Sequence, residues 1–313
     1  MYESKGNSNS TVSEDPCLVM SLKGHKKSIT DVCFNPGTKQ FASSSEDNSL
    51  MIWNMDQNIR SYNFSGHNDI VTSVEFSSDG KLLASSSKDQ NVRFWVPTIR
   101  GETCVFKAHT SAVNCVSFSP DNKKIITGSN DKSVKVWDVL KRQFISSLVG
   151  HNNWVRCAKY SPEGNFVVSG ADDRTIRVWD SKTSQCEHVF VSQSSSPTYL
   201  SIHTNNNTVA VAMDSGSVRV YDLRNKKLQQ HYTLHEGSTT CVSWHPTANF
   251  FSSCGKDGKI RIVDVMEGRP LYTLGGHEGI VTSCKFSSDG KYFASGGSDR
   301  FIMLWKTNFI NED

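Results

Sequence analysis

Long hydrophobic runs are absent from this 313-residue sequence. No stretch approaches the roughly 20 consecutive apolar residues that a membrane-spanning helix requires. The first residues, MYESKGNSNSTVSEDP, also contain no apolar segment like the centre of a secretory signal peptide. We therefore expect a chain of the cytoplasm or nucleus that neither binds a membrane nor enters the secretory pathway.

Paired cysteines and a strong excess of one charge are missing as well. The nine cysteines include no CxxC pair, and five of them stand alone within apolar segments: Cys33, Cys115, Cys157, Cys241 and Cys284. We expect reduced, packed thiols. The net charge of +3 and the pI near 8.3 are too small for the concentrated basic surface that nucleic-acid-binding proteins usually carry. We therefore expect no nucleic acid as a partner and no bound metal or cofactor.

What the sequence does contain is a repeat with a period of 42 residues. The first column of this repeat is His25, His67, His109, His151, Gln193, His235 and His277. The second column is Asp47, Asp89, Asp131, Asp173, Ser215, Asp257 and Asp299, and the third is Trp53, Trp95, Trp137, Trp179, Tyr221, Val263 and Trp305. Three columns in one register indicate seven copies of a single structural unit.

Within one copy, short β-rich runs alternate with turn residues. After His109 the expected strands are Val113–Phe118, Lys124–Gly128, Ser133–Trp137 and Phe144–Leu148. Apolar residues lie on both faces of several runs, which indicates sheets packed between two neighbours.

A period of this length, with a histidine early and Trp-Asp late in each copy, resembles the WD40 family. The resemblance implies an all-β, seven-bladed β-propeller in which each copy is a four-stranded blade. One extra strand, Cys17–Leu22, precedes the first copy, and the seventh copy ends without its fourth strand. We expect this N-terminal strand to complete the last blade and close the ring. The propeller then covers residues 17–309, with a disordered polar tail at 1–16 and a short end at 310–313.

The recurring histidine, hydroxyl and aspartate are the residue types of a hydrolytic triad. Because the set recurs in five copies, we interpret it as structural and expect no enzyme activity. The WD40 resemblance implies a buried chain of hydrogen bonds from the tryptophan through the hydroxyl and the histidine to the aspartate. The complete sets are His25, Ser43, Asp47, Trp53; His67, Ser85, Asp89, Trp95; His109, Thr127, Asp131, Trp137; His151, Ser169, Asp173, Trp179; and His277, Ser295, Asp299, Trp305.

Copies five and six depart from this pattern. Copy five has Gln193, Val211, Ser215 and Tyr221 at the four places. Copy six keeps the histidine, serine and aspartate but has Val263 in place of tryptophan. We expect both blades to form and to be the soft sector of the ring.

One face of the expected propeller carries the loops before each first strand and the turns after each second strand. In WD40 proteins this face is a common docking surface, and most of its residues here are small or polar. Trp154 and Arg156 in copy four are the exceptions, and both residue types are frequent anchors of protein interfaces. Asp172 on the same blade and Lys88 two blades away would add charge around them. The alternative is that Trp154 packs on its own blade and that Asp172 and Lys88 are ordinary solvated residues.

Several stretches have a more particular sequence: VRFWVPTIRGE (92–102), NWVRCAKYSP (153–162), QQHY (229–232), MEGRPLYTL (266–274), YFASGGSD (292–299) and LWKTNF (304–309). Together they resemble the proteome-of-centriole family of WD40 proteins. The resemblance implies a non-enzymatic scaffold of centrioles and basal bodies that stabilises the microtubule triplet wall and supports cilium formation. The implied partners are tubulin and neighbouring centriolar proteins, with no small-molecule substrate. Members of this family usually continue into a C-terminal coiled-coil segment, which this sequence, ending at Asp313, does not contain.

Other classes of WD40 protein fit the sequence less well. A substrate receptor of a ubiquitin ligase would normally carry an F-box or similar helical module, and a G-protein β-like subunit would carry a long N-terminal helix. Residues 1–16 are rich in serine, asparagine and glycine, which disfavours a helix. An enzyme would need polar residues outside the repeat that converge on one pocket, and the sequence shows no such set. A substrate receptor or adaptor of another cytosolic or nuclear complex stays open as the alternative.

Overall fold

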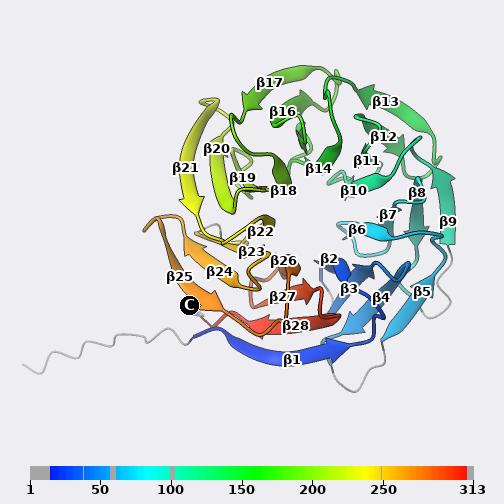
Figure 1. The fold of residues 1–313 in the computed structure, drawn as a ribbon. Coiled ribbons are helices and arrows are strands. Elements are labelled where there is room, and N and C mark those ends of the chain that lie inside the picture. Colours follow the sequence, from blue (N-terminus) through cyan, green and yellow to red (C-terminus); the bar gives the residue numbers. More distant parts are fainter. Residues whose placement is uncertain (1–14, 38, 57–60, 99–102, 248, 309–313) are drawn as a thin grey trace, which may run out of the picture.

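The computed structural model describes residues 15–37, 39–56, 61–98, 103–247 and 249–308. Its regular elements are 28 β-strands. These strands form seven four-stranded antiparallel sheets arranged around a central axis (Figure 1). The all-β, seven-bladed propeller is therefore confirmed. In the part of the chain that the structure describes, no helix reaches the length and hydrophobicity that crossing a bilayer requires.

Blades 1 to 6 each run from an innermost to an outermost strand in chain order. Blade 1 is β2 (Ile29–Phe34), β3 (Gln40–Ser45), β4 (Ser49–Asn54) and β5 (Tyr62–Ser65), and blade 2 is β6 (Val71–Phe76), β7 (Leu83–Ser87), β8 (Asn91–Trp95) and β9 (Thr103–Lys107). Blade 3 is β10 (Val113–Phe118), β11 (Lys124–Ser129), β12 (Val134–Asp138) and β13 (Phe144–Leu148), and blade 4 is β14 (Val155–Tyr160), β15 (Phe166–Ala171), β16 (Thr175–Asp180) and β17 (Cys186–Val191). Blade 5 is β18 (Pro197–Ile202), β19 (Thr208–Met213), β20 (Ser217–Asp222) and β21 (Lys227–Thr233), and blade 6 is β22 (Thr239–Trp244), β23 (Phe250–Gly255), β24 (Ile260–Asp264) and β25 (Arg269–Leu274).

Blade 7 combines the two ends of the described chain. It contains β26 (Val281–Phe286), β27 (Tyr292–Gly297) and β28 (Phe301–Lys306), and its fourth strand is β1 (Cys17–Lys23). β1 pairs antiparallel with β28 and lies on its outer side (Figure 1). The side chain of Asn308 also donates a hydrogen bond to the carbonyl oxygen of Asp15 at 3.3 Å. Strand pairing between residues far apart in the sequence thus joins blade 7 to the N-terminal strand.

The strands in blade 3 match the expected runs to within one residue at each end. The difference at β12 has a local cause. Ser133 lies just before this strand because its N–H and its hydroxyl both donate to Oδ1 of Asp131, at 3.1 and 2.6 Å. The serine thus belongs to the turn. Of the predicted tail at 1–16, residues 1–14 lie outside the described residues, as does the predicted end at 310–313.

Each blade turns from its second to its third strand through a residue with a left-handed backbone. These residues are Asn48, Gln90, Lys132, Arg174, Gly216, Gly258 and Arg300, with φ between 61° and 83°. The turn aspartate holds this conformation by accepting hydrogen bonds from the residue two places later. Blade 5 has Ser215 at the aspartate position, and its left-handed residue is Gly216, which adopts this backbone at little steric cost.

The hydrophobic core lies between the blades. Seven clusters of buried residues occur, and each joins two neighbouring blades; between blades 4 and 5, for example, Val178 and Phe190 pack with Val209 and Tyr221. The apolar residues on both faces of the strands are therefore explained by radial packing. All nine cysteines are free thiols, and the five that the sequence places in apolar segments are buried.

Candidate functional site

The four recurring residues form one hydrogen-bonded chain in each of five blades. In blade 4 the Trp179 indole N–H donates to the Ser169 hydroxyl at 2.8 Å, and that hydroxyl lies 2.7 Å from Nε2 of His151. Nδ1 of His151 lies 3.0 Å from a carboxylate oxygen of Asp173. Equivalent contacts occur for His25, His67, His109 and His277. The predicted networks are confirmed.

The histidines of these hydrogen-bonded chains are shielded from solvent. The side chain of His151 has no exposed surface, and the same holds for His25, His67 and His109. Burial lowers the pKa of His151, although its hydrogen bond to Asp173 acts in the opposite direction. Burial alone would raise the pKa of Asp173, but hydrogen bonds from Thr175, Asn152 and His151 hold it below its usual value. The chain therefore joins a neutral imidazole to an ionised carboxylate and pins the loop before the first strand to the turn after the second.

Blade 5 lacks this chain and has a smaller substitute. Gln193 is exposed, so it does not enter the position that histidine occupies elsewhere. Instead, Nη1 of Arg219 donates to the hydroxyl of Ser192 at 2.8 Å, and this hydroxyl lies 3.2 Å from that of Ser195. The substitute thus anchors the loop through Ser192 rather than through residue 193.

Blade 6 keeps part of the chain. His235 bonds both Ser253 and Asp257 at 2.9 Å, and Val263, at the tryptophan position, is fully buried. The chain therefore ends at the serine, as the sequence predicts. Arg261 compensates in part by donating to Asp257 at 2.8 Å. Whether blades 5 and 6 are softer than the others stays a prediction.

The small polar residues of the expected docking face have a role that the sequence did not reveal. The Thr72 hydroxyl donates to the carbonyl oxygen of Val113 in the next blade at 2.6 Å, and the Thr240 hydroxyl donates to that of Val281 at 2.5 Å. Equivalent bonds between neighbouring blades come from Thr30, Asn114 and Thr198. These side chains therefore hold neighbouring blades together on this face, which we call the top face.

At blade 7 the Thr282 hydroxyl instead donates to the Gly296 carbonyl of its own blade at 2.8 Å. At blade 4 the corresponding position is occupied by Arg156. Its Nε and Nη2 groups donate to the two carboxylate oxygens of Asp172, at 2.8 and 2.6 Å. The guanidinium also lies over the ring of Trp154, 5.2 Å from its centroid. Trp154 is 45% exposed, so packing on its own blade covers only part of the side chain. The structure thus brings three of the four predicted site residues together, and we call them the Trp154 cluster.

Lys88 lies apart from this cluster. It is an exposed residue in the turn after β7 of blade 2, and blade 3 separates it from blade 4. A groove of about 600 Å³ instead leads from Arg156 and Asp172 across blades 5 and 6, where Asp214 and Lys256 line it. Both residues occupy the same column as Asp172 and Lys88, one place before each turn aspartate position. That column, followed around the ring, is the signal that could have identified them.

The central channel contains a set of charged residues that sequence analysis missed. Lys285 lies 3.2 Å from Asp31, and Lys159 pairs with Glu75. Burial acts to lower the pKa of Lys285, but the Asp31 carboxylate acting together with Tyr199 and nearby cysteines more than offsets this, and the pKa is raised. The sequence analysis expected no set of polar residues outside the repeat to meet in one place, and this expectation was wrong. The four residues lie in four different blades, and only the folded ring brings them together.

The channel charges connect neighbouring blades through hydrogen bonds. Asp31 of blade 1 accepts hydrogen bonds from Ser73 of blade 2 at 2.8 Å and from Ser283 of blade 7 at 2.9 Å. Glu75 of blade 2 accepts one from Ser117 of blade 3 at 3.0 Å. Charges that are paired and hydrogen-bonded across blades in this way favour a single arrangement of their neighbours.

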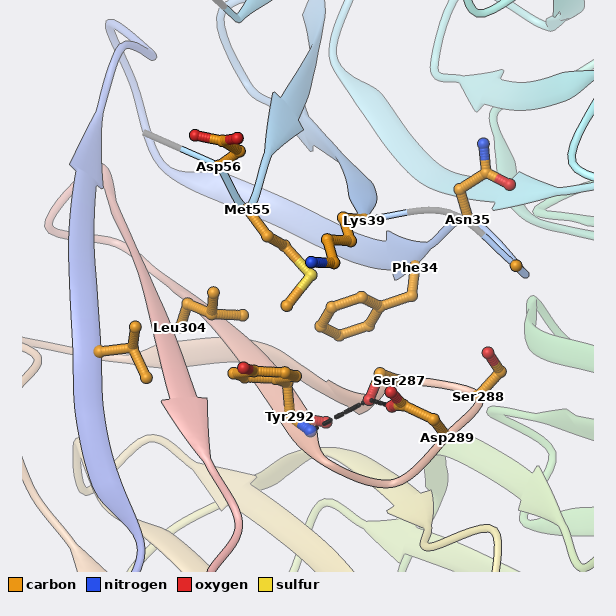
Figure 2. Close-up of a pocket in the computed structure, with 12 residues that line it drawn as sticks. Phe34, Asn35, Lys39, Met55, Asp56, Ser287, Ser288, Asp289, Tyr292 and Leu304 are labelled. Atoms are coloured by element: carbon orange, nitrogen blue, oxygen red, sulfur yellow. Dashed lines mark hydrogen bonds between the residues drawn. The ribbon is translucent and has the colours of Figure 1, made fainter. Parts of the chain in front are cut away.

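A pocket of about 470 Å³ lies at the seam between blades 1 and 7, on the face opposite the top face (Figure 2). Phe34 and Met55 form one wall, and Tyr292 faces them from blade 7 (Figure 2). Lys39 and Asp289 lie at its polar edge, and Asp289 accepts a hydrogen bond from Ser287 at 2.5 Å. The pocket suits an apolar side chain, and none of the predicted site residues lines it.

Comparison with known protein families finds matches that recur along the chain with the blades. A sequence profile described as WD40, "WD domain, G-beta repeat", matches residues 16–54, 58–96, 101–138, 142–180, 226–264 and 268–306, which is well over half of the chain. This chain belongs to the WD40-repeat family. The gap between the fourth and fifth matched segments, 181–225, includes most of blade 5, where the WD40 hydrogen-bond chain is missing.

Short segments of this WD40 protein are also similar to curated centriolar proteins. "POC1 centriolar protein homolog A" of Xenopus tropicalis is 55% identical over 51 residues, and "POC1 centriolar protein homolog B" of Danio rerio is 48% identical over 54 residues. These matches cover 16% and 17% of this chain and only 12% and 11% of the two relatives. The resemblance to the proteome-of-centriole family is confirmed over these segments.

Proposed function

We propose that this WD40 propeller is a non-enzymatic interaction scaffold of centrioles and basal bodies. The similarity to curated relatives whose names describe them as centriolar supports the location. In this proposal the chain contacts tubulin and neighbouring centriolar proteins, stabilises the microtubule triplet wall and supports cilium formation. The paired and buried polar residues of the blades support a structural rather than a catalytic use of the repeat.

The Trp154 cluster is the proposed docking site, and the exposure of Trp154 is the observation that carries this assignment. An exposed indole gains binding energy when a partner removes water from it, and tryptophan and arginine are over-represented among such anchors. The bond to Asp172 fixes the guanidinium of Arg156 through Nε and Nη2. Its Nη1 edge is then presented in a defined direction to a carboxylate of the partner. Asp172 acts here as a positioning residue, and Lys88 would add charge at a distance.

Fluorescent tagging in ciliated cells tests this proposal. We expect the tagged wild-type chain to accumulate at centrioles and basal bodies and the Trp154→Ala, Arg156→Ala double variant to be recruited several-fold less. The control is Met266→Ala with Arg224→Ala, which removes an exposed apolar residue and an exposed arginine from other blades. Wild-type protein that accumulates at a different structure would contradict the centriolar role. Equal recruitment of the two double variants would contradict the docking site alone.

A further inference from the structure

The outermost strand of blade 3 exposes apolar side chains, as several other outer strands also do. Phe144 and Ile145 of β13 are 53% and 44% exposed, and Leu140 in the preceding turn is 85% exposed. All residues from 140 to 145 are exposed. One edge of β13 pairs with β12, and the sheet order β10-β11-β12-β13 leaves its other edge without a strand. This free edge therefore combines available backbone groups with an apolar surface.

The other outer strands carry features that discourage pairing with another chain. Charged residues and proline on an edge strand, or a very short strand, are the usual protection. β1 and β9 each end in a lysine, β17 contains Glu187, β21 begins with Lys227, β25 begins with Arg269 and Pro270, and β5 has only four residues. The sequence of β13, FISSL, has no charge and no proline. Among the outer strands, β13 alone is both uncharged and longer than four residues.

The N-terminal end of β13 is positively charged. Lys141 and Arg142 in the turn before it are exposed, and Lys123 is brought to the same turn because the Val139 N–H donates to its carbonyl oxygen at 2.9 Å. The carboxylate of Asp138 accepts a hydrogen bond from the Lys141 backbone N–H at 2.7 Å, so it is used within the turn. The opposite end of the strand continues into Val149, which is exposed and uncharged. The edge therefore has one cationic end and one neutral end.

We propose that the free edge of β13 binds an extended segment of another protein by adding it as a fifth, antiparallel strand. All strand pairs within the blades are antiparallel, and antiparallel addition places the C-terminal end of the incoming segment beside Lys141 and Arg142. The segment has alternating apolar residues, which cover Phe144 and Ile145, and carboxylates toward its C-terminal end. Backbone hydrogen bonds provide affinity, and the position of the charges provides direction.

A second copy of this chain fits the edge less well. Two β13 strands paired antiparallel would place the cationic end of each beside the Val149 end of the other, so the cations would meet no carboxylate. This site is on the rim of the propeller and does not depend on the top-face docking site of the Trp154 cluster.

Peptide binding tests the proposal directly. The probe is a short synthetic peptide that alternates valine with threonine and ends in consecutive glutamates, and its control has the same composition with the glutamates at the N-terminal end. We expect the full chain to bind the first peptide several-fold more tightly in fluorescence anisotropy. Hydrogen–deuterium exchange should show slower exchange confined to residues 144–148. Equal affinity for both peptides, or protection elsewhere, would overturn the proposal.

Two matched pairs of variants identify the groups that bind. Arg142→Glu should weaken the peptide roughly two- to fivefold. Lys132→Glu is the matched control and should leave peptide affinity unchanged. It makes the same change of charge on the same blade, at another residue with a left-handed backbone. Ile145→Thr should weaken binding roughly tenfold through lost apolar contact, whereas Val191→Thr at the exposed end of β17 should not. Equal effects within either pair would contradict the site. Wild-type self-association that Ile145→Thr abolishes in sedimentation would make a second copy the occupant instead.

Discussion

Blades 4 and 5 are neighbours with the same strand order, yet their loops are held in different ways. In blade 4 the chain from Trp179 through Ser169 and His151 to Asp173 is complete. In the corresponding region of blade 5, Arg219 donates to the Ser192 hydroxyl, and the Ser196 N–H donates to the Asp214 carboxylate at 3.0 Å. The cores of the two blades show no such difference, because Tyr221 is buried and its ring lies 4.7 Å from that of Phe190 in blade 4.

This contrast separates two kinds of stabilisation in one ring. Packing between blades forms and aligns the strands, since blade 5 forms them without the network. The network has a narrower task, which is to pin the loop before the first strand to the turn after the second. Blade 5 should therefore keep its strands and open more readily at its loop.

Removing the histidine of blade 4 should have the largest effect on this contrast. His151→Ala leaves the Ser169 hydroxyl and the Asp173 carboxylate without their buried partner, so the free energy of unfolding should fall by about 1–3 kcal/mol. Gln193→Ala, at the same column in blade 5, should change it by less than about 0.5 kcal/mol because the side chain is exposed. Urea unfolding measures both. Equal losses would mean that Gln193 anchors its loop as firmly as the histidine does.

Acidification should have the second-largest effect on the difference in stability between blades 4 and 5. Burial lowers the pKa of His25, His151 and His235 below the usual 6.5, so the unfolded chain takes up protons that the native blades resist. The stability that these histidines contribute is complete above about pH 6.5 and is lost as the pH falls through their native-state pKa values. Aspartates of the networks add a second loss below about pH 4, since hydrogen bonds hold the pKa of Asp173 and Asp257 below 3.8, with Asp257 at about 2.

Hydrogen exchange at pH 7 and pH 5, corrected for the intrinsic rate, measures this difference blade by blade. We expect the loop before β14 of blade 4 to lose protection at pH 5 and the loop before β18 of blade 5 to change little. The same loss of protection in both loops would show that the histidine networks are not the source of the acid sensitivity.

The smallest effect should come from the substitute bond of blade 5. Arg219→Ala removes the donor to Ser192, and the free energy of unfolding should fall by about 1 kcal/mol. Arg224→Ala, an exposed arginine in the same blade, should change it by less than about 0.5 kcal/mol. Thermal melting of the two variants gives the comparison. If Arg219→Ala lowered the free energy of unfolding as much as His151→Ala does, the two blades would not differ in how firmly their loops are held.

Much of the fold could be predicted from the sequence because each structural role recurs every 42 residues. The strands of blade 3 and the five complete networks, for example, each follow from several copies that agree. The interblade bonds of Thr72 and Thr240 could not be predicted, because each hydroxyl donates to a backbone carbonyl of the next copy, and any residue type provides such a carbonyl.

The charged pairs of the channel were missed for a related reason. The column of Lys285 mixes residue types, including Glu75 and Lys159, and the column of Asp31 contains no other acidic residue. Asp31 and Lys285 come from the first and last blades. Their pairing depends on the closed ring rather than on any local pattern. The Trp154 cluster could be predicted only in part. The column pattern identified Trp154 and Arg156, but only the structure shows the bidentate bond to Asp172 and the separation from Lys88.

Microtubule co-sedimentation of purified protein, below the melting temperature of every variant, tests the central claim that repeated residues hold the propeller while the Trp154 cluster binds. We predict that His151→Ala melts at a lower temperature and pellets with microtubules as wild type does. The Trp154→Ala, Arg156→Ala variant should melt close to wild type and remain in the supernatant. Folded His151→Ala that fails to pellet, together with a Trp154→Ala, Arg156→Ala variant that pellets normally, would contradict the account.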